Sequence, residues 1–302
     1  MTRQLFLFLS RQRRVRAWME TSPFARKLSR RFVAGETLEQ GIAACENLRK
    51  DGFLCSLDHL GENVTSLEEA ASARNAYLDA LDRIGKRGLN ASISLKLTQM
   101  GLDFSEQACL DNVRSLAQRA RAAGTHVEID MESTAYTDRT LDMVEKVAGE
   151  CGCVRAVIQA YLFRSASDIQ RMNRLGIPVR LCKGAYLEPH SAAFAKKIDV
   201  DRNYLTLMKT LLDRGVHPAI ATHDERIQGE AVRYARERGL GKDKFEFQML
   251  YGIRRDLQRR LADQGYRVRL YVPYGTAWYP YLMRRLAERP ANLLFLLRNL
   301  FR

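Results

Sequence analysis

Two charged side chains stand at the ends of short apolar segments of this sequence. Lys96 follows Ser-Ile-Ser-Leu, and Asp130 follows Val-Glu-Ile. A charge in such a position must lie in a polar pocket or meet an opposite charge, because burying an unpaired charge is very costly. We therefore expect both side chains to belong to a polar site.

A glycine turn with two cations is a second candidate. In the segment PVRLCKGAY, Arg180 and Lys183 lie at a predicted strand-to-loop transition, and Gly184 follows directly. Glycine lets backbone N–H groups approach a phosphate, and the cations supply positive charge. The segment has neither the Walker spacing nor a GxGxxG pattern. It predicts an anion site without identifying the anion.

His223, in the segment ATHD, is the third candidate. It could be a metal ligand, a general base or a hydrogen-bond donor to a cofactor. The five histidines are scattered, and no second histidine stands at a ligand-like spacing. A metal is therefore the weakest of the three alternatives, and we predict no metal site.

Arg284 and Arg285 are neighbours on a predicted helix that a break at Pro290 separates from a last amphipathic segment. Their side chains point about 100° apart and could hold one carboxylate from two sides. The alternative from the helix alone is a surface pair with Glu288.

Eight short apolar segments alternate with longer helical patterns and must position these residues. Strands of this kind, alternating with helices, predict a parallel sheet, and eight units predict an α/β fold closed into a (βα)₈ TIM-like barrel. We assign residues 51–302 to the barrel with its C-terminal helices, and residues 1–50 to an N-terminal extension of two or three helices. The predicted strands are Phe53–Leu57, Ala91–Leu97, His126–Met131, Val154–Ala160, Pro178–Cys182, Pro218–Thr222, Phe245–Leu250 and Val268–Val272.

Capping residues mark several helix ends. Ser66 and Ser105 are predicted N-caps, and glycines at 88, 124, 176 and 215 occupy predicted C-caps.

In such a barrel the functional side chains lie at the carboxyl ends of the strands. These positions hold polar residues in nearly every unit: Asp58, Glu62, Lys96, Asp130, Glu132, Gln159, Tyr161, Arg180, Lys183, His223, Gln248, Tyr271 and Tyr274.

Composition narrows the class of protein. The 302 residues carry 49 Lys and Arg against 35 Asp and Glu, a formal charge of +14, and 46% are apolar. This composition is typical of a folded protein rather than a disordered one. Six scattered cysteines predict thiols in a reducing compartment. The N-terminal apolar stretch precedes its basic residues, which is the reverse of a signal peptide, and no segment is long enough to span a bilayer.

Short segments spread over about four-fifths of the chain resemble the proline dehydrogenases, in particular the monofunctional bacterial flavoenzymes. The resemblance rests on their order and spacing: RFVAGE, LDHLGENV, SISLKL, VEIDME, VIQAYLFR, VRLCKGAY, ATHD, FEFQMLYGIR, VRLYVPYGTAW and YLMRRLAERPAN. It implies a distorted (βα)₈ barrel that oxidises L-proline to pyrroline-5-carboxylate with non-covalent FAD, the first step from proline to glutamate.

The resemblance also implies roles for individual residues. Asp130 and Arg180 match catalytic positions, with Arg180 near the reactive flavin nitrogen. Glu62 matches a gate that pairs with Arg284 when substrate is absent, and the base for the substrate amine stays open between Asp130 and water. Substrate contacts match Lys96, Arg284, Arg285, Tyr271, Tyr281, Tyr186 and Leu250. FAD contacts match Met131, Gln159, Arg180, Lys183, Gly184, Ala185, Thr222 and His223.

The same resemblance implies a membrane quinone as electron acceptor and a separate downstream dehydrogenase for pyrroline-5-carboxylate or glutamate semialdehyde. We expect a cytoplasmic protein with peripheral contact to the cytoplasmic face of the inner membrane, because basic amphipathic ends suit an anionic surface. Two other hypotheses compete: an aldolase that uses Lys96 as a Schiff base, and a basic adaptor for nucleic acid or membrane. Nucleic acid is not needed to explain the charge.

Overall fold

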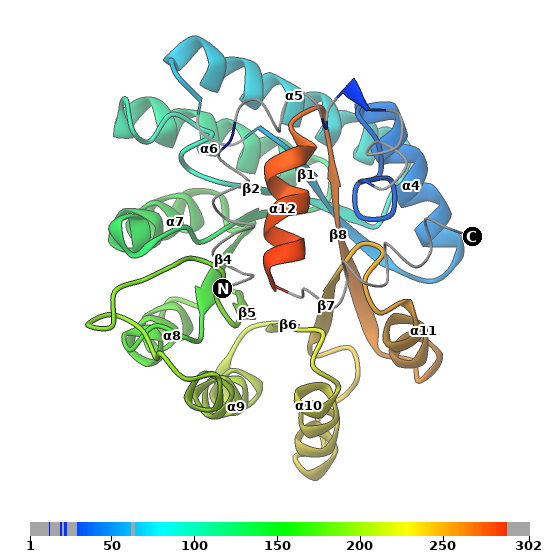
Figure 1. Ribbon diagram of the computed structural model, residues 1–302, viewed down its shortest axis with the longest axis vertical. Coiled ribbons are helices and arrows are strands. Elements are labelled where there is room, and N and C mark those ends of the chain that lie inside the picture. The colour runs from blue at the N-terminus through cyan, green and yellow to red at the C-terminus, as the bar shows by residue number, and fades with distance from the viewer. Residues whose placement is uncertain (1–11, 13–18, 20, 23–28, 62–63, 289–302) are drawn as a thin grey trace.

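Eight parallel strands follow one another along the chain and form a closed barrel (Figure 1). The computed structural model describes residues 12, 19, 21–22, 29–61 and 64–288, except the side chains of 284 and 286–288. The strands are β1 (Leu54–His59), β2 (Ala91–Leu95), β3 (Val127–Ile129), β4 (Val154–Gln159), β5 (Val179–Cys182), β6 (Ala219–Ala221), β7 (Glu246–Leu250) and β8 (Arg267–Tyr274). All eight predicted strands are confirmed to within two residues at each end. The pairing of β8 with β1 closes the ring.

Helices surround the barrel and connect its strands. The caps predicted at Ser66 and Ser105 are confirmed, since each hydroxyl accepts a hydrogen bond from a backbone N–H three residues later. The helices are α4 (Leu38–Lys50), α5 (Leu67–Lys86), α6 (Glu106–Ala122), α7 (Thr137–Cys151), α8 (Ser165–Arg174), α9 (Lys197–Arg214), α10 (Glu225–Glu237), α11 (Arg255–Asp263) and α12 (Trp278–Glu288), with a 3₁₀ turn η1 (Thr134–Tyr136).

The predicted C-cap glycines divide into two kinds. Those at 88, 124 and 176 have φ between +56° and +67°, the left-handed conformation that glycine adopts without a steric penalty. Gly215 ends α9 with φ −81° instead. The left-handed residue of that loop is His217, with φ +42°.

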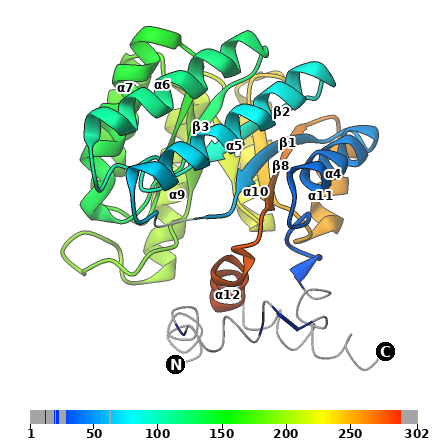
Figure 2. The ribbon, with the colours of Figure 1, turned by 90° about the horizontal axis from the view of Figure 1, so that it is seen from above.

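The helices α4 and α12 lie at two different places on the barrel. The helix α4 packs against β1 and β8 on the outside of the barrel, and its Ile42 and Cys45 share the main apolar core. The helix α12 instead lies across the end of the barrel (Figures 1 and 2). There Trp278, Tyr279 and Leu282 form a second apolar cluster with Phe32 and others. The predicted boundary between residues 50 and 51 stays a prediction, and most of residues 1–28 lie outside the described residues.

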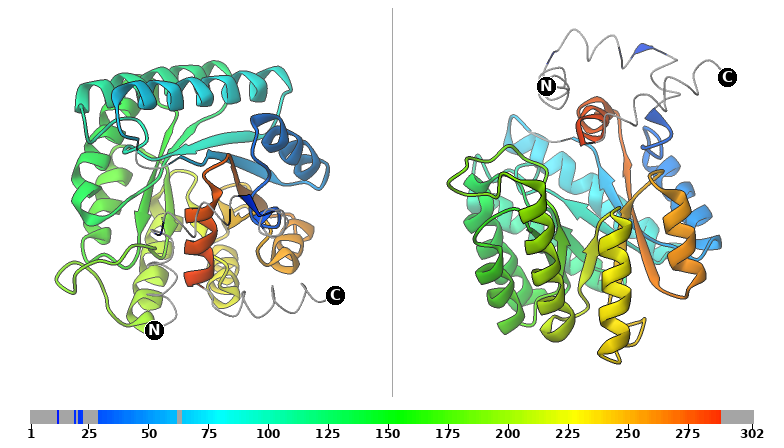
Figure 3. Two further views of the ribbon diagram at one scale, coloured as in Figure 1. Left: turned by 45° about the horizontal axis from the view of Figure 1, so that its top comes forward. Right: turned by 60° about the horizontal axis from the view of Figure 1, so that its bottom comes forward.

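The strands carry apolar side chains outward and polar ones inward. Outward residues such as Ile93, Ile129 and Leu270 pack under the surrounding helices, which Figure 3 shows from two sides. Inward residues alternate with them, and they contact one another across the ring: Arg155 on β4 donates to Glu246 on β7. These two strands are not neighbours, so both side chains must point into the barrel. The interior of this barrel is therefore charged.

In the part of the chain that the structure describes, no helix is long and apolar enough to cross a membrane. All six cysteines are free thiols, and four of them are buried.

The hydroxyl of Tyr77 links α5 to the barrel, and its removal measures how much this link contributes to stability. It donates to the Ser94 carbonyl at 2.8 Å and accepts from the His59 N–H at 3.1 Å. We expect Tyr77→Phe to lower the free energy of unfolding by about 1–3 kcal/mol, because it removes the partner of two buried backbone groups. Tyr136→Phe is the control, since its hydroxyl donates to Asp103 in an exposed hydrogen bond. Urea unfolding measures both, and a loss for Tyr77→Phe no larger than for the control would contradict this role.

Candidate active site

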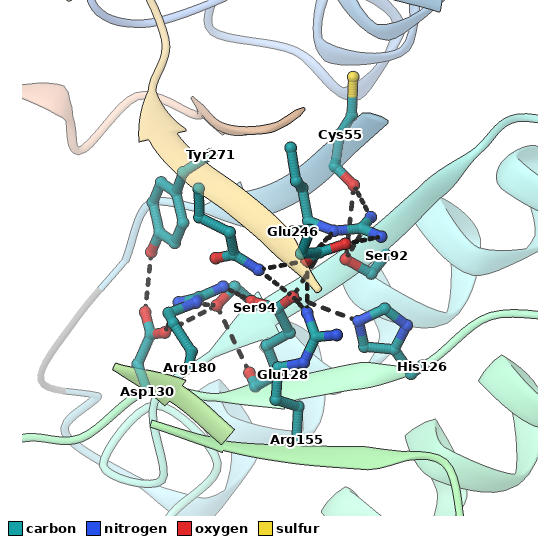
Figure 4. Close-up of polar contacts among 12 residues, drawn as sticks. Cys55, Ser92, Ser94, His126, Glu128, Asp130, Arg155, Arg180, Glu246 and Tyr271 are labelled. Atoms are coloured by element: carbon teal, nitrogen blue, oxygen red, sulfur yellow. Dashed lines mark hydrogen bonds and ion pairs between the residues drawn. The ribbon is translucent and has the colours of Figure 1, made fainter. Parts of the chain in front are cut away.

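Four donors converge on the carboxylate of Asp130, directly after β3, and Figure 4 shows Ser94, Arg180 and Tyr271 among them. Its Oδ1 accepts from Ser94 Oγ at 2.8 Å and from Arg180 Nη1 at 2.6 Å. Its Oδ2 accepts from Tyr271 Oη at 2.9 Å and from Lys96 Nζ at 3.4 Å. Ser94 and Lys96 come from β2 and the residue after it, whereas Arg180 lies on β5 and Tyr271 on β8. Closure of the barrel therefore brings together three segments that lie far apart in the sequence. Lys96, Asp130, Arg180 and Tyr271 therefore lie together, and their roles in an active site stay a prediction.

Burial controls the electrostatics of this site. It raises the pKa of Asp130 above the ordinary aspartate value, while the Lys96 ammonium opposes that rise. Burial also lowers the pKa of Arg180 to about 10. At neutral pH the arginine therefore stays charged, and it faces a carboxylate inside a low-dielectric barrel, where their attraction is strong.

Tyr271 completes the cluster with its ring and its hydroxyl. The guanidinium of Arg180 lies 5.5 Å from the centre of the ring, within range of a cation–π interaction. Burial and the nearby Asp130 charge raise the pKa of the phenol well above its usual value. The phenol therefore stays protonated and donates a hydrogen bond to Asp130.

A second charged layer lies below this cluster, and the sequence analysis missed it. Glu128 on β3 accepts from Arg155 Nη1 at 2.9 Å, and Glu246 accepts from Arg155 at 2.6 Å and from Arg269 Nε at 2.8 Å. Gln248 donates to both glutamates. A signal was present: charges recur at alternate positions inside apolar strands, as in Val-Glu-Ile-Asp and Arg-Val-Arg-Leu. That period predicts two stacked polar layers facing inward.

The helix α12 brings the expected pocket residues to the rim. Tyr281 is buried, and the guanidinium of Arg285 lies 5.2 Å from the centre of its ring. Tyr186, in the loop after β5, and Leu250, at the end of β7, are half-buried at the same end of the barrel. The side chain of Arg284 and the whole of Glu62 lie outside the described residues. The predicted gate stays a prediction.

A loop after β5 packs closely against the residues after β4. Gln159 accepts from the Ala185 N–H at 3.4 Å and donates to the Glu132 carbonyl at 2.9 Å. Gly184 has φ +115°, and a Cβ there would lie 2.1 Å from the Tyr161 ring. Only glycine fits this approach without displacing the ring or the loop. The glycine turn is half-buried at the rim.

Lys183 pairs with two carboxylates at the rim. Its Nζ lies 2.5 Å from Asp201 Oδ1, in the first turns of α9, and 2.9 Å from Asp224 Oδ2, the N-cap of α10. Burial would raise the pKa of both aspartates, but the Lys183 ammonium outweighs it and holds them below their usual range. The sequence did not indicate either partner. An ammonium has three donors, so one stays available to a ligand.

His223 and Thr222 follow β6 at the same rim. The His223 Nε2 accepts from the Leu250 N–H at 2.9 Å, so that nitrogen is the unprotonated one. The Thr222 hydroxyl accepts from the Asp224 N–H. Met131, two residues beyond β3, is buried. No group of three or more His, Cys, Asp or Glu side chains within the described residues is arranged to hold a metal ion.

Comparison with known proteins identifies the family. A family model described as proline dehydrogenase matches residues 42–298. The chain belongs to the proline dehydrogenase family. It is 40% identical to "Proline dehydrogenase 1" of Bacillus subtilis over 100% of both chains, and 40% identical to "Proline dehydrogenase" of Deinococcus radiodurans over 91% of this chain and 90% of that one. The resemblance read from the motifs is confirmed.

Solved structures share the proline dehydrogenase fold. The proline utilization A (PutA) structure of Bdellovibrio bacteriovorus, inactivated by N-propargylglycine, has a TM-score of 0.82 and 27% identity, and the match covers 87% of this chain and 33% of that one. The "Bifunctional protein PutA" of Salmonella typhimurium is 28% identical over 90% of this chain and 24% of its own length. This chain thus corresponds to one part of these longer proteins.

His126 tests the electrostatics of the lower layer of this proline dehydrogenase. Its ring contacts Glu128 at 3.2 Å, and burial, together with Arg155, holds its pKa well below the ordinary histidine value. Below about pH 6.5, His126 binds a proton in the unfolded chain but not in the folded one. The free energy of unfolding therefore falls by up to about 1.4 kcal/mol per pH unit as the pH is lowered. We expect His126→Gln to lose less stability than wild type between pH 7 and pH 5. Parallel curves from urea unfolding would contradict this.

Proposed function

We propose that the protein is an FAD-dependent proline dehydrogenase that oxidises L-proline to pyrroline-5-carboxylate. Membership of the family supports proline as substrate. The observation that carries the assignment is the cluster of Lys96, Arg180 and Tyr271 around the buried Asp130 at the barrel end. It supplies fixed positive charge and an aromatic wall at one point, which is what binding and orienting a small zwitterion requires.

The residues present fit a flavin. The Nε of Arg180 is buried and has no hydrogen-bond partner, and an unsatisfied buried donor is costly unless a ligand supplies an acceptor. Lys183 and Gly184 are both half-buried at the rim, so part of this turn is open to a ligand. When bound, FAD accepts the hydride from proline. Residues that would hold it are Met131 through its backbone, with Gln159, Arg180, Lys183, Gly184, Ala185, Thr222 and His223.

Two groups of side chains would hold the proline. Lys96, Arg284 and Arg285 would surround its carboxylate, and three cations neutralise that charge and fix its position. Tyr271, Tyr281, Tyr186 and Leu250 would form the walls around the ring. Glu62 would pair with Arg284 when the site lacks substrate.

Asp130 acts in this proposal by holding its neighbours. Its two oxygens already accept four hydrogen bonds, and a carboxylate offers about four acceptor positions. The Lys96 amine forms an ion pair with Asp130, which argues against a Schiff base there because that chemistry needs a neutral amine. Water is then the group that takes the proton from the substrate amine.

Electrons would pass from the flavin to a membrane quinone, and a separate dehydrogenase would consume the product. Large exposed apolar side chains at the barrel end support contact with a lipid surface: Phe104, Phe163, Leu187 and Ile198 lie in the loops that follow the strands or at the start of a helix there. The charge of +14 favours an anionic surface. We propose a cytoplasmic protein in peripheral contact with the inner membrane.

The decisive experiment is an anaerobic titration of the FAD-loaded protein with L-proline. We expect a yellow protein whose visible flavin absorbance is bleached in proportion to the proline added, because the flavin takes up two electrons per proline. D-Proline is the matched control and should leave the spectrum unchanged. A protein that binds no FAD, or a bound flavin that L-proline does not reduce, would refute the proposal.

The carboxylate clamp is tested by Arg285→Met and Arg284→Met, separately and together. Each lost charge-assisted hydrogen bond costs about 1.5–3 kcal/mol, so KM for proline should rise about 10- to 100-fold per substitution while FAD stays bound. Arg267→Met, at the exposed start of β8 and the opposite end of the barrel, is the control. Unchanged proline kinetics in the double variant would remove the pair from the substrate site.

A further inference from the structure

Glu128 lies fully buried beneath the active site and has no role in the proposed reaction so far. It is two residues before Asp130 on β3, so both side chains point into the barrel, one below the other. Asp130 contacts Arg180 through Nη1, and Glu128 forms an ion pair with the same guanidinium through Nη2 (Figure 4). Arg180 is therefore held between two carboxylates of a single strand.

This double contact fixes more than a single ion pair could. Arginine has a long side chain with several rotatable bonds, and one carboxylate leaves the guanidinium plane free to turn about the contact. A second carboxylate on the other terminal nitrogen restricts that rotation, since the donors of arginine form a rigid fork. The plane then lies against the ring of Tyr271. Its Nε is buried without a hydrogen-bond partner, and Nη2 meets Glu128 Oε2 as an ion pair without a hydrogen bond.

The lower charged layer compensates the cost of burying the charge on Glu128. Its Oε1 accepts from Arg155 and from Gln248, each at 2.9 Å, and Arg269 Nε lies 3.8 Å away. Glu246 balances these two arginines from β7. The opposite oxygen of Glu128 is thereby left for Arg180. A buried ion pair is weak support for stability by itself, so its orientation toward the active site is the informative feature.

We propose that Glu128 is a positioning residue that sets the orientation of the Arg180 guanidinium, and through it the reactivity of the bound flavin. This proposal rests on the proposed function. Glu128 touches neither substrate nor flavin in it and acts through Arg180 alone. Arg155 and Gln248 hold the other oxygen of Glu128.

The test compares Glu128→Gln with Glu246→Gln in the full-length, FAD-loaded protein. Both substitutions remove one buried carboxylate from the same charged layer. Glu128 forms an ion pair with Arg180, whereas Glu246 pairs with Arg155 and Arg269. We expect Glu128→Gln to lower kcat with proline about 10- to 100-fold, because a small misplacement of a reacting group has that effect. KM for proline should stay within about twofold. Glu246→Gln should lower Tm and leave kcat within about twofold of wild type.

A double-substitution cycle shows whether the effect passes through Arg180. Lysine lacks the planar fork of arginine, so it cannot hold Asp130 and Glu128 through two separate terminal nitrogens in one fixed plane. In an Arg180→Lys background, Glu128→Gln should therefore cause little further loss of kcat and little further change in the flavin midpoint potential. Two results would overturn the proposal. One is that Glu128→Gln lowers kcat by the same factor in the Arg180→Lys background as in wild type, and the other is that Glu128→Gln and Glu246→Gln lower kcat equally.

A second variant covers the case in which Glu128→Gln does not fold. Glu128→Asp keeps the buried charge for Arg155 but draws it back from Arg180 by one methylene group. We expect it to bind FAD, to melt close to wild type and to show a loss of kcat that again vanishes beside Arg180→Lys. A folded Glu128→Asp with wild-type kcat and potential would refute the proposal. Failure of the proposed function would appear separately, as a wild-type protein that L-proline does not reduce.

Discussion

The structure depends on keeping charged side chains inside a closed barrel. Barrels of this type usually fill their interior with branched apolar residues, whereas this one holds Lys96, three arginines and three carboxylates among its inward-facing positions. Each of these charges would be very costly to bury alone. Each therefore has a partner from another strand, and these pairings link strands on opposite sides of the ring.

This constraint places rigid charge where the chemistry is proposed. Asp130 and Arg180 meet at the boundary between the paired interior and the rim, and Arg180 also contacts Glu128 of the layer below. The helix α12 lies over the end of the barrel and not at its side, and it carries Tyr281 and Arg285, which belong to the other half of the proposed site. The place beside β1 and β8 is taken by α4.

Periodic patterns explain how much could be predicted. The eight strands, the caps at Ser66 and Ser105 and the polar strand ends follow from local spacing, because each depends on residues close in the chain. The lower charged layer was missed, although Glu128 and Arg155 stand in a period of two within apolar strands. The partners of Lys183 were missed because Asp201 and Asp224 lie 18 and 41 residues away with no motif to connect them.

The sequence by itself determined the fold class, the family and the set of residues at the strand ends, since these depend on composition, period and motif order. Only the tertiary structure decided which charges face each other. Arg155 and Glu246 are 91 residues apart, and Arg180 and Asp130 are 50 apart. Such pairs form because barrel closure and strand register bring inward side chains to one level. The need to neutralise buried charge then selects the partners, and no local pattern contains that information.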